Sequence, residues 1–343
     1  MKPIRVLALM HPTLVPPETL EGYSEKEINV WKTEYDVVST LRRLGHEVRP
    51  LGVQYELNPI RETVEEWKPH VVFNLLEEFH GETTYDLNVA AYLELLRVAY
   101  TGCNPRGLVI ARGKALAKKL LSYHRIRVPA FAVFPRGRKV RRATRLGFPL
   151  IVKSLLEHAS VGIARASVVE SDEKLEERVG FVHDRIGTDA IAEQYIEGRE
   201  LYVGVLGNDR LTVLPTWELE FKNRTPGTPF IATERAKHNL EYQEKWGVEV
   251  GPAQNLPAAV ESRIAPITKR IYRTLELDGY ARIDYRLSDQ GELFFLEANP
   301  NPEIAQAEEF AQAATHAGLP YAELLERILR LGRQRAAATD SED

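Results

Sequence analysis

Four polar side chains lie on two short apolar segments near the C-terminal end of the sequence, Arg282 and Asp284 on the first, Glu297 and Asn299 on the second. Both segments are rich in aromatic and branched residues, and the turn-forming residues 288–291 separate them, so they predict an antiparallel hairpin. Two carboxylates and an amide oxygen on one hairpin face suit a hard cation such as Mg²⁺, which usually shares its oxygen ligands with substrate phosphates. The pattern therefore predicts a metal site.

The register of this hairpin decides which side chains meet. With residues 288–291 as the loop, we expect these opposite pairs: Ile283 with Leu296, Tyr285 with Phe294, Arg282 with Glu297, and Asp284 with Phe295. Side chains alternate between the two faces of a strand, so a slip of one residue would bury the acids with the wrong partners. A surface hairpin with solvated charges is the alternative, but residues 293–296 are too apolar for an exposed edge.

Composition limits the class of protein. The 343 residues, 44% of them hydrophobic, can bury a large core divided among two or three domains. Lys and Arg number 45 against 49 Asp and Glu, which argues against nucleic acid or an anionic membrane as the main partner. The single cysteine, Cys103, excludes an intrachain disulfide and fits a reducing compartment. No apolar run is long enough to span a bilayer, and the N-terminus does not read as a signal peptide. We expect a cytoplasmic protein.

The first hundred residues predict an N-terminal α/β unit, which would position the ligand-binding loops that follow its strands. They alternate between strand and helix, which predicts an open α/β unit with parallel strands. The expected strands are 4–9, 47–51 and 70–74, and the expected helices are 25–44, 60–67 and 85–97. The loop after the first strand, residues 10–14, lacks the glycines that a dinucleotide pyrophosphate requires, which argues against a Rossmann dehydrogenase.

The loop after the third strand, residues 76–82, is a candidate ligand site, because α/β sheets bind ligands at the carboxyl ends of their strands. His80 and Glu82 in this loop would orient a substrate. The alternative is that His80 is a satisfied structural group.

The middle of the chain carries lysines that phosphates would need. Lys153 ends a strongly apolar strand pattern, and a buried lysine is costly unless an anion pairs with it. A preceding helical pattern, residues 113–123, displays Lys114, Lys118 and Lys119, for which a solvated face is the alternative. The small-residue loop 157–163, which includes Ser160, has backbone amides that would close over a phosphate, although such loops are common.

Residues 190–201 form a second candidate binding element. A strand pattern ends at Glu193, Tyr195 and Ile196, then turns through Gly198 to Glu200. The strand edge would hydrogen-bond a purine, with Tyr195 and Ile196 against its ring and Glu200 accepting from ribose hydroxyls. A plain hairpin with solvated glutamates is the alternative.

Taken together, the order and spacing of these motifs resemble the ATP-grasp superfamily, most closely its D-alanine–D-alanine ligase branch. The resemblance covers nearly the whole chain. It is carried by five segments: residues 75–82, 149–153, 160–162 and 193–200, and the hairpin 282–284 with 297–299.

The resemblance implies a role for each matching residue. Lys114 and Lys153 would touch nucleotide phosphates, with the Ser160 loop folding over them, and Lys237 would be a further lysine on the phosphate side. Glu193, Tyr195 and Ile196 would hold adenine, and Glu200 ribose. Asp284, Glu297 and Asn299 would hold two Mg²⁺ ions, with Mn²⁺ as an alternative, and Arg282 would stabilise the transferring phosphoryl group and the later oxyanion.

The implied fold is α/β and α+β: an ATP-grasp fold with an N-terminal α/β preATP-grasp domain. We expect the preATP-grasp domain at residues 1–104, a small ATP-grasp lid at 105–195, a large ATP-grasp domain at 196–331 and a disordered tail at 336–343. Leu324, Leu325, Ile328 and Leu329 should be core residues of C-terminal helices. A homodimer is implied by the resemblance alone.

The implied activity is that of an ATP-dependent carboxylate–amine ligase. A substrate carboxylate attacks the γ-phosphate of ATP, and an amine attacks the acyl phosphate that results. Phosphoryl transfer is mostly positioning and charge neutralisation, which lysines, an arginine and metal ions provide. Water would hydrolyse the intermediate, so we expect a closing loop, either the Ser160 loop or residues 222–237.

The two substrates, a carboxylate and an amine, should be small molecules, namely amino acids. At two places the sequence departs from the ligase pattern in segments that bind these substrates. Residues 10–13 replace a glycine-rich loop with a serine and a glutamate, and residues 300–306 lack a glycine and serine that follow the metal-binding asparagine. Glu303 and Gln306 would face a substrate amine or amide, or would cap a helix that begins near Ile304. The D-alanine dipeptide is therefore one candidate product.

Two other functions remain open on the sequence. One is a kinase-like or carboxylase-like ATP-grasp enzyme with a single acceptor, and the other is a non-catalytic nucleotide-binding regulator. The acids, the lysines and Arg282 argue against the regulator.

Overall fold

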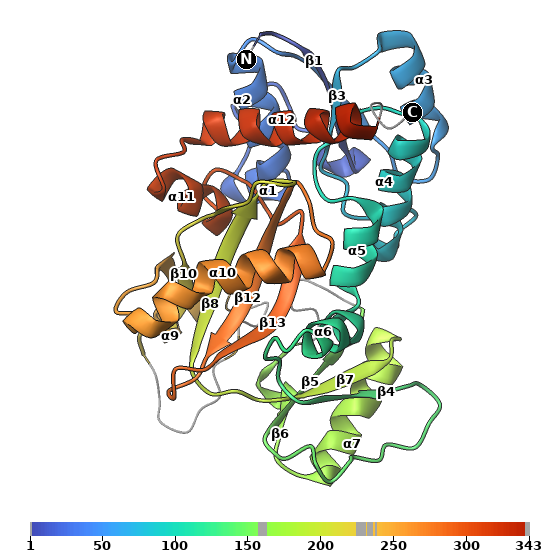
Figure 1. The fold of residues 1–343 in the computed structure, drawn as a ribbon. Coiled ribbons are helices and arrows are strands. Elements are labelled where there is room, and N and C mark those ends of the chain that lie inside the picture. The colour runs from blue at the N-terminus through green and yellow to red at the C-terminus, as the bar shows by residue number, and fades with distance from the viewer. Residues whose placement is uncertain (1, 157–162, 224–230, 232–235, 237–238, 340–343) are drawn as a thin grey trace.

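The fold is seen in a computed structural model that describes residues 2–156, 163–223, 231, 236 and 239–339. The strands of this part of the chain form three sheets, of three, six and four strands. In Figure 1 the three-stranded sheet lies at the top, the six-stranded sheet in the middle and the four-stranded sheet at the bottom. This mixture of parallel and antiparallel sheets with helices confirms the expected α/β and α+β class.

The N-terminal sheet is parallel, as expected, with β1 (Arg5–Met10) between β2 (Glu47–Gly52) and β3 (Val71–Asn74). Val6, Ala8 and Met10 share one core with helices α2 (Lys32–Arg43) and α12 (Tyr321–Thr339), and the alternate residues of β1 share another with α3 (Asn58–Trp67) and α4 (Asp86–Leu95). Both faces of the sheet are therefore covered, which explains the nearly continuous apolar sequence of β1.

The helix expected at residues 25–44 is in fact two helices. α1 (Glu25–Val30) and α2 meet at Trp31, whose φ of −126° and ψ of 26° break the helical path. Trp31 is 7% exposed and packs against the rings of Tyr23 and Tyr35. Because Trp31 is buried like an apolar residue of a continuous helix, helical periodicity alone did not reveal the break between α1 and α2.

The six-stranded sheet carries the predicted hairpin. Its order is β11-β10-β8-β12-β13, and β9 also pairs with β8. Its strands are β8 (Arg199–Leu206), β9 (Thr212–Val213), β10 (Trp217–Phe221), β11 (Val248–Pro252), β12 (Tyr280–Leu287) and β13 (Leu293–Pro300).

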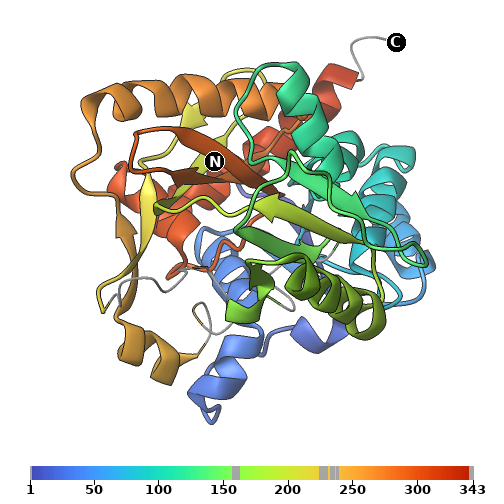
Figure 2. The same cartoon turned by 90° about the horizontal axis from the view of Figure 1, so that it is seen from below.

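One face of this sheet is covered by α10 (Ala258–Thr274), which shares a core with Ile283 and Tyr285 of β12. Because side chains alternate along a strand, Arg282 and Asp284 lie on the face opposite α10. Figure 2 shows the blue N-terminal helices on that side of the sheet, away from the orange helix α10, and α11 (Glu309–His316) shares a core there with Tyr202 of β8.

The four-stranded sheet is antiparallel, in the order β4-β7-β5-β6. α7 (Asp172–Phe181) packs on it, and α5 (Pro105–Arg112) and α6 (Lys114–Tyr123) link it to the N-terminal sheet. The strands are β4 (Phe131–Phe134), β5 (Leu150–Ser154), β6 (Val168–Val169) and β7 (Ala190–Gln194). The remaining described helices are α9 (Leu240–Trp246), a π-helix at Val182–Ile186 and 3₁₀ turns at Pro12–Leu14, Thr83–Tyr85 and Arg165–Ser167. The exact limits of the three expected domains stay a prediction.

The C-terminal segment differs in part from expectation. Leu324, Leu325, Ile328 and Leu329 are buried, which confirms that they are core residues. The helix expected near Ile304 begins only at Glu309. α12 continues to Thr339, so residues 336–339 of the expected disordered tail are helical, and residues 340–343 lie outside the described part.

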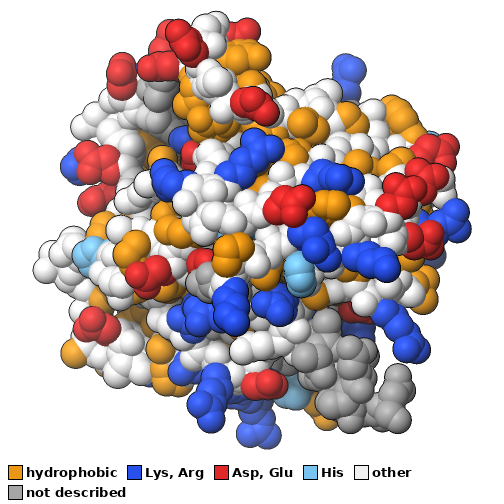
Figure 3. Space-filling model, turned by 90° about the horizontal axis from the view of Figure 1, so that it is seen from above, with side chains coloured by type: hydrophobic (Ala, Val, Ile, Leu, Met, Phe, Trp, Pro, Cys, Tyr) orange, Lys and Arg blue, Asp and Glu red, His pale blue; other side chains and the backbone are white. Residues whose placement is uncertain are grey.

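The surface agrees with the small net charge. Figure 3 shows a face on which acidic and basic side chains are interspersed with apolar ones. None of the described helices is both long and apolar enough to cross a membrane.

Candidate active site

The hairpin register differs from the expected one. Arg282 pairs with Asn299 and Asp284 with Glu297, and the register then shifts, so that Tyr285 pairs with Phe295. The connection is one residue longer than expected because the Ser288 amide donates to the Glu292 carbonyl. A bulge between Asp284 and Tyr285 adds the second residue of the shift, since two residues on one strand then face one on the other.

The corrected register brings the four predicted polar residues closer together. The Arg282 guanidinium donates to both Asp284 oxygens, at 2.8 and 2.9 Å. The Asn299 amide donates to Asp284 Oδ2 at 2.9 Å, and Glu297 is directly opposite Asp284 on β13. Asp284 is only 3% exposed, and Arg282, Glu297 and Asn299 around it are partly buried, so Asp284 is the buried centre of this polar cluster.

A carboxylate that the sequence did not single out completes the environment of Arg282. Glu309, the first residue of α11, accepts a hydrogen bond from Arg282 Nη1. The guanidinium also lies 4.7 Å from the ring centre of Tyr202. Burial works against the charge on Arg282, but Asp284 and Glu309 outweigh it and raise the arginine's pKa well above its usual value. Arg282 is thus held as a fixed cation.

The donor set fits a magnesium site. Asp284 and Glu297 supply carboxylate oxygens, and Asn299, which donates through its amide nitrogen, keeps its amide oxygen for a cation. Among the described residues no group of three or more His, Cys, Asp or Glu side chains is arranged to hold a metal. The amide oxygen of Asn299 is therefore needed as the third ligand.

A second polar cluster lies between α6 and the four-stranded sheet. Glu193, 1% exposed on β7, has Lys118 Nζ 3.1 Å from one oxygen and Lys153 Nζ 3.3 Å from the other. Lys118 also donates to the carbonyl of Leu296, at the hairpin bulge, and lies 5.5 Å from the ring centre of Phe295. The cluster thus joins the small sheet to the candidate metal hairpin.

Lys114 and Lys118 are 6% and 1% exposed, so a solvated face is the wrong interpretation for them, although it is correct for Lys119. Burial, opposed by Glu297 for Lys114 and by Glu193 for Lys118, lowers the pKa of both lysines. For Lys153, burial is outweighed by Glu193 and Glu297, and the pKa is raised. Lys118 was missed as a site residue, although its position one helical turn after Lys114 was a signal.

The two glutamates predicted to bind the nucleotide, Glu193 and Glu200, are buried rather than solvated. Glu200 is 8% exposed and accepts from Arg286 at 2.7 Å and from the Tyr202 hydroxyl at 3.0 Å, so the alternative with solvated glutamates is wrong. The Tyr195 amide donates to the Pro149 carbonyl, and Ile196 follows it in the link between β7 and β8, partly exposed. Their contacts with a nucleotide stay a prediction.

Two predicted residues, Ser160 and Lys237, lie outside the described part of the chain, as do most of the residues of the two expected closing loops. The other loop prediction, His80 and Glu82, falls on an exposed turn. His80 packs edge-on against Tyr55, with ring centres 4.9 Å apart. The role of His80 and Glu82 in orienting a substrate stays a prediction.

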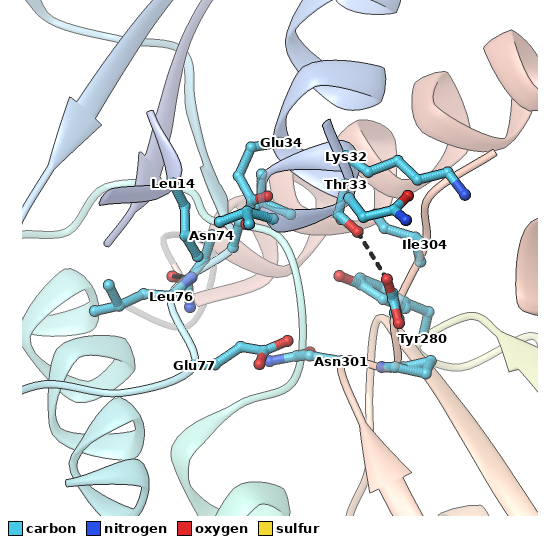
Figure 4. Close-up of a pocket in the computed structure, with 15 residues that line it drawn as sticks. Leu14, Lys32, Thr33, Glu34, Asn74, Leu76, Glu77, Tyr280, Asn301 and Ile304 are labelled. Carbon is cyan, nitrogen blue, oxygen red and sulfur yellow. Dashed lines mark hydrogen bonds between the residues drawn. The ribbon is translucent and has the colours of Figure 1, made fainter. Parts of the chain in front are cut away.

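The structure instead brings an earlier residue of that loop to a cavity. A cavity of about 200 Å³ lies beside the hairpin cluster, and Glu77 lines it together with Glu34 and Tyr280 (Figure 4). Glu303 also belongs to its lining. Tyr280 is two residues before Arg282 on β12, so the two side chains share a face of the sheet. The cavity and the polar cluster are therefore neighbouring parts of one site.

The chain matches known proteins along most of its length. A family model for the D-ala D-ala ligase C-terminus matches residues 120–330. The D-alanine–D-alanine ligase of Desulforudis audaxviator is 30% identical over 315 residues, covering 91% of this chain and 96% of the relative.

Solved structures share the fold. The D-alanine–D-alanine ligase of Bacillus anthracis, complexed with ATP, superimposes with a TM-score of 0.73 at 22% identity and covers 98% of this chain and 99% of its own. The VanG D-Ala:D-Ser ligase of Enterococcus faecalis gives a TM-score of 0.69 at 20% identity, over 96% of this chain and all of its own.

Proposed function

Because the chain belongs to the D-alanine–D-alanine ligase family of ATP-grasp enzymes and is thus an ATP-dependent carboxylate–amine ligase, we propose that its site around Arg282 and Asp284 joins two amino-acid substrates through an acyl phosphate. The observation that carries the proposal is the cluster of Arg282, Asp284, Asn299 and Glu297 on one face of the hairpin. ATP and a divalent metal are the cofactors of such a ligase.

Asp284, Glu297 and Asn299 would hold two Mg²⁺ ions. Bound Mg²⁺ would neutralise charge on the β- and γ-phosphates and orient them for in-line transfer. Arg282 already occupies a fixed position between Asp284 and Glu309, so its guanidinium needs little reorganisation to stabilise charge on the transferring group. That preorganisation is what the geometry contributes to the chemistry.

Lys114 and Lys153 would bind nucleotide phosphates, and Ser160 and Lys237 would add contacts from the loops. Glu193, Tyr195 and Ile196 would hold the adenine, and Glu200 the ribose. Glu193 supports this proposal because its carboxylate lies 3.3 Å from Lys153 Nζ and so holds the lysine that would bind a phosphate in one position.

In this scheme the carboxylate oxygen of the first substrate attacks the γ-phosphorus and ADP leaves. The amine of the second substrate then attacks the acyl carbon, and phosphate leaves with the oxygen that came from the carboxylate. His80 and Glu82 would orient a substrate near the third strand. The D-alanine dipeptide is one candidate product, and a homodimer in the cytoplasm is the expected state.

The first prediction is that ADP appears only when a carboxylate and an amine are both supplied. We expect a screen of amino-acid pairs with ATP and Mg²⁺ to give ADP, phosphate and an amide in equal amounts, measured by a coupled assay and mass spectrometry. Turnover with a single acceptor would favour the kinase-like or carboxylase-like enzyme. Saturable ATP binding without turnover across the screen would favour the regulator.

A further inference from the structure

The cavity beside the hairpin cluster is lined mainly by three parts of the chain that are far apart in sequence. Most of its lining comes from the end of α1 with the start of α2, from the end of β3 with the residues after it, and from the segment that follows β13, and Leu14 and Tyr280 complete it. Its volume of about 200 Å³ is many times the roughly 10–15 Å³ that one water molecule requires. It therefore has room for part of a small organic molecule.

Glu34, in the first turn of α2, is the unusual residue of this cavity. It is 6% exposed, yet none of the described residues forms an ion pair or side-chain hydrogen bond with its carboxylate, which has only its own backbone amide. In Figure 4 the side chain reaches from α2 toward Asn74 and the cavity. A buried carboxylate without a partner is costly, and this cost is removed when a cation binds.

Two more carboxylates line the same cavity. Glu77 follows β3 and Glu303 follows β13, where Glu303 accepts from the Thr33 hydroxyl at 3.3 Å. Among the described residues that line the cavity, Lys32 is the one with a cationic side chain, beside the three carboxylates. The cavity is thus built for positive charge.

The carboxylates also disfavour one another's ionisation. Burial, with the charges of Glu77 and Glu303, raises the pKa of Glu34 to about 7. Burial and the charge of Glu77 likewise raise the pKa of Glu303. A cation placed among them would relieve this repulsion.

The arrangement of the carboxylates favours an organic cation over a metal ion. The described carboxylates of the cavity do not form a group of three that could hold one metal ion. Spaced carboxylates suit an ammonium or guanidinium group, whose several donors point in different directions. The hydroxyl end of Tyr280 faces the same space in Figure 4 and offers one more acceptor.

The position of the cavity relative to the metal cluster follows from residue spacing along β12 and β13. Tyr280 lies two residues before Arg282, and Asn301 lies two residues after Asn299, so the cavity begins where the metal cluster ends. Building on the proposed ligase function, we propose that this cavity binds a cationic side chain, so that one of the two ligated substrates is a basic amino acid.

The test compares amino acids that differ in charge but little in shape. Lysine is paired with norleucine and arginine with citrulline, each in both enantiomers and each supplied with alanine as the second substrate, ATP and Mg²⁺. We expect kcat/KM for the basic member of at least one pair to exceed that of the neutral member by about tenfold or more. Product identity is checked by mass spectrometry.

Variants then assign the preference to the cavity. Glu34→Gln and Glu303→Gln should each reduce the ratio of basic to neutral kcat/KM about tenfold, mainly through KM for the basic substrate. The Glu303 side chain is more exposed than that of Glu34, so its variant should fold even if a change at Glu34 does not. Glu65→Gln, on the exposed surface of α3, is the matched control and should leave the ratio unchanged.

The outcomes separate the two proposals. Ligation that prefers the neutral members, or a preference for basic members that both variants leave intact, overturns the inference and leaves the ligase function standing. Absence of an amide product from every pair in the wider amino-acid screen overturns the ligase function, and the inference falls with it.

Discussion

Asp284→Asn should lower kcat for ATP-dependent ligation by about 10²- to 10³-fold. The substitution keeps the size of the side chain but removes a negative charge from the centre of the candidate metal cluster. It also leaves the Arg282 guanidinium, which now donates to both Asp284 oxygens, with a neutral partner on that side. ADP release with a ligatable amino-acid pair, measured across a Mg²⁺ titration, gives the effect.

The matched control lies on the same hairpin. Asp289→Asn changes an exposed carboxylate in the turn, and should retain the wild-type rate and Mg²⁺ dependence. If Asp284→Asn kept the same kcat and the same Mg²⁺ dependence as Asp289→Asn, the metal assignment at this hairpin would be wrong. Thermal unfolding of both variants tells a lost reaction from a lost fold.

Glu193→Gln should destabilise the fold by about 3–5 kcal/mol, because it removes the carboxylate from a buried group of two lysines. Lys118 is 1% exposed and Lys153 Nζ lies 3.3 Å from Glu193, so neither ammonium gains a replacement carboxylate from the substitution. The free energy of unfolding, from urea titration at pH 7, measures the loss.

The loss of stability in Glu193→Gln should depend on pH. Although burial opposes it, attraction by Lys118 and Lys153 holds the pKa of Glu193 below its usual 4.5. The stabilisation is therefore complete above pH 4.5 and is lost as pH falls through the lower, folded-state pKa. We expect the difference in stability between wild type and Glu193→Gln to shrink as the pH falls below 4.5. Glu177→Gln, an exposed change on α7, is the control, and a Glu193→Gln protein as stable as this control would contradict the account.

The hairpin illustrates what local sequence can predict. Aromatic and branched residues on either side of the turn-forming residues 288–291 identified both strands, and the two-residue period of a strand put Arg282, Asp284, Glu297 and Asn299 in one group. The register was wrong because a bulge and a longer turn depend on hydrogen bonds that no local pattern specifies, including that of the Ser288 amide. The group survived the error because the total shift near Asp284 was two residues, which preserves the face.

The three lysines of α6 show why the burial of a charged side chain cannot be predicted from the sequence of its own helix. Lys114, Lys118 and Lys119 look equivalent in sequence, and only packing against the four-stranded sheet and the hairpin buries the first two. Their partners, Glu193 and Glu297, are far away in sequence. Burial that depends on such long-range contacts cannot be deduced from helical spacing.

The cavity was the least predictable part of the site. Glu34 belongs to the helix expected at residues 25–44, for which the sequence indicated no binding role. Glu77 lies in the loop at residues 76–82, where His80 and Glu82 were chosen as the candidate residues instead. Glu303 was identified as facing a substrate amine or as a helix cap, and the helix begins later, at Glu309. Only the folded chain brings these three carboxylates to one cavity.

The most direct test of the central claim, ligation through an acyl phosphate, follows an oxygen atom. The carboxylate substrate of an active pair is labelled with ¹⁸O in both carboxyl oxygens, and the phosphate released in one turnover is analysed by mass spectrometry. The account predicts one ¹⁸O atom in each phosphate, because the oxygen that attacks ATP leaves with the phosphoryl group. Phosphate that contains no ¹⁸O while the amide forms would contradict it.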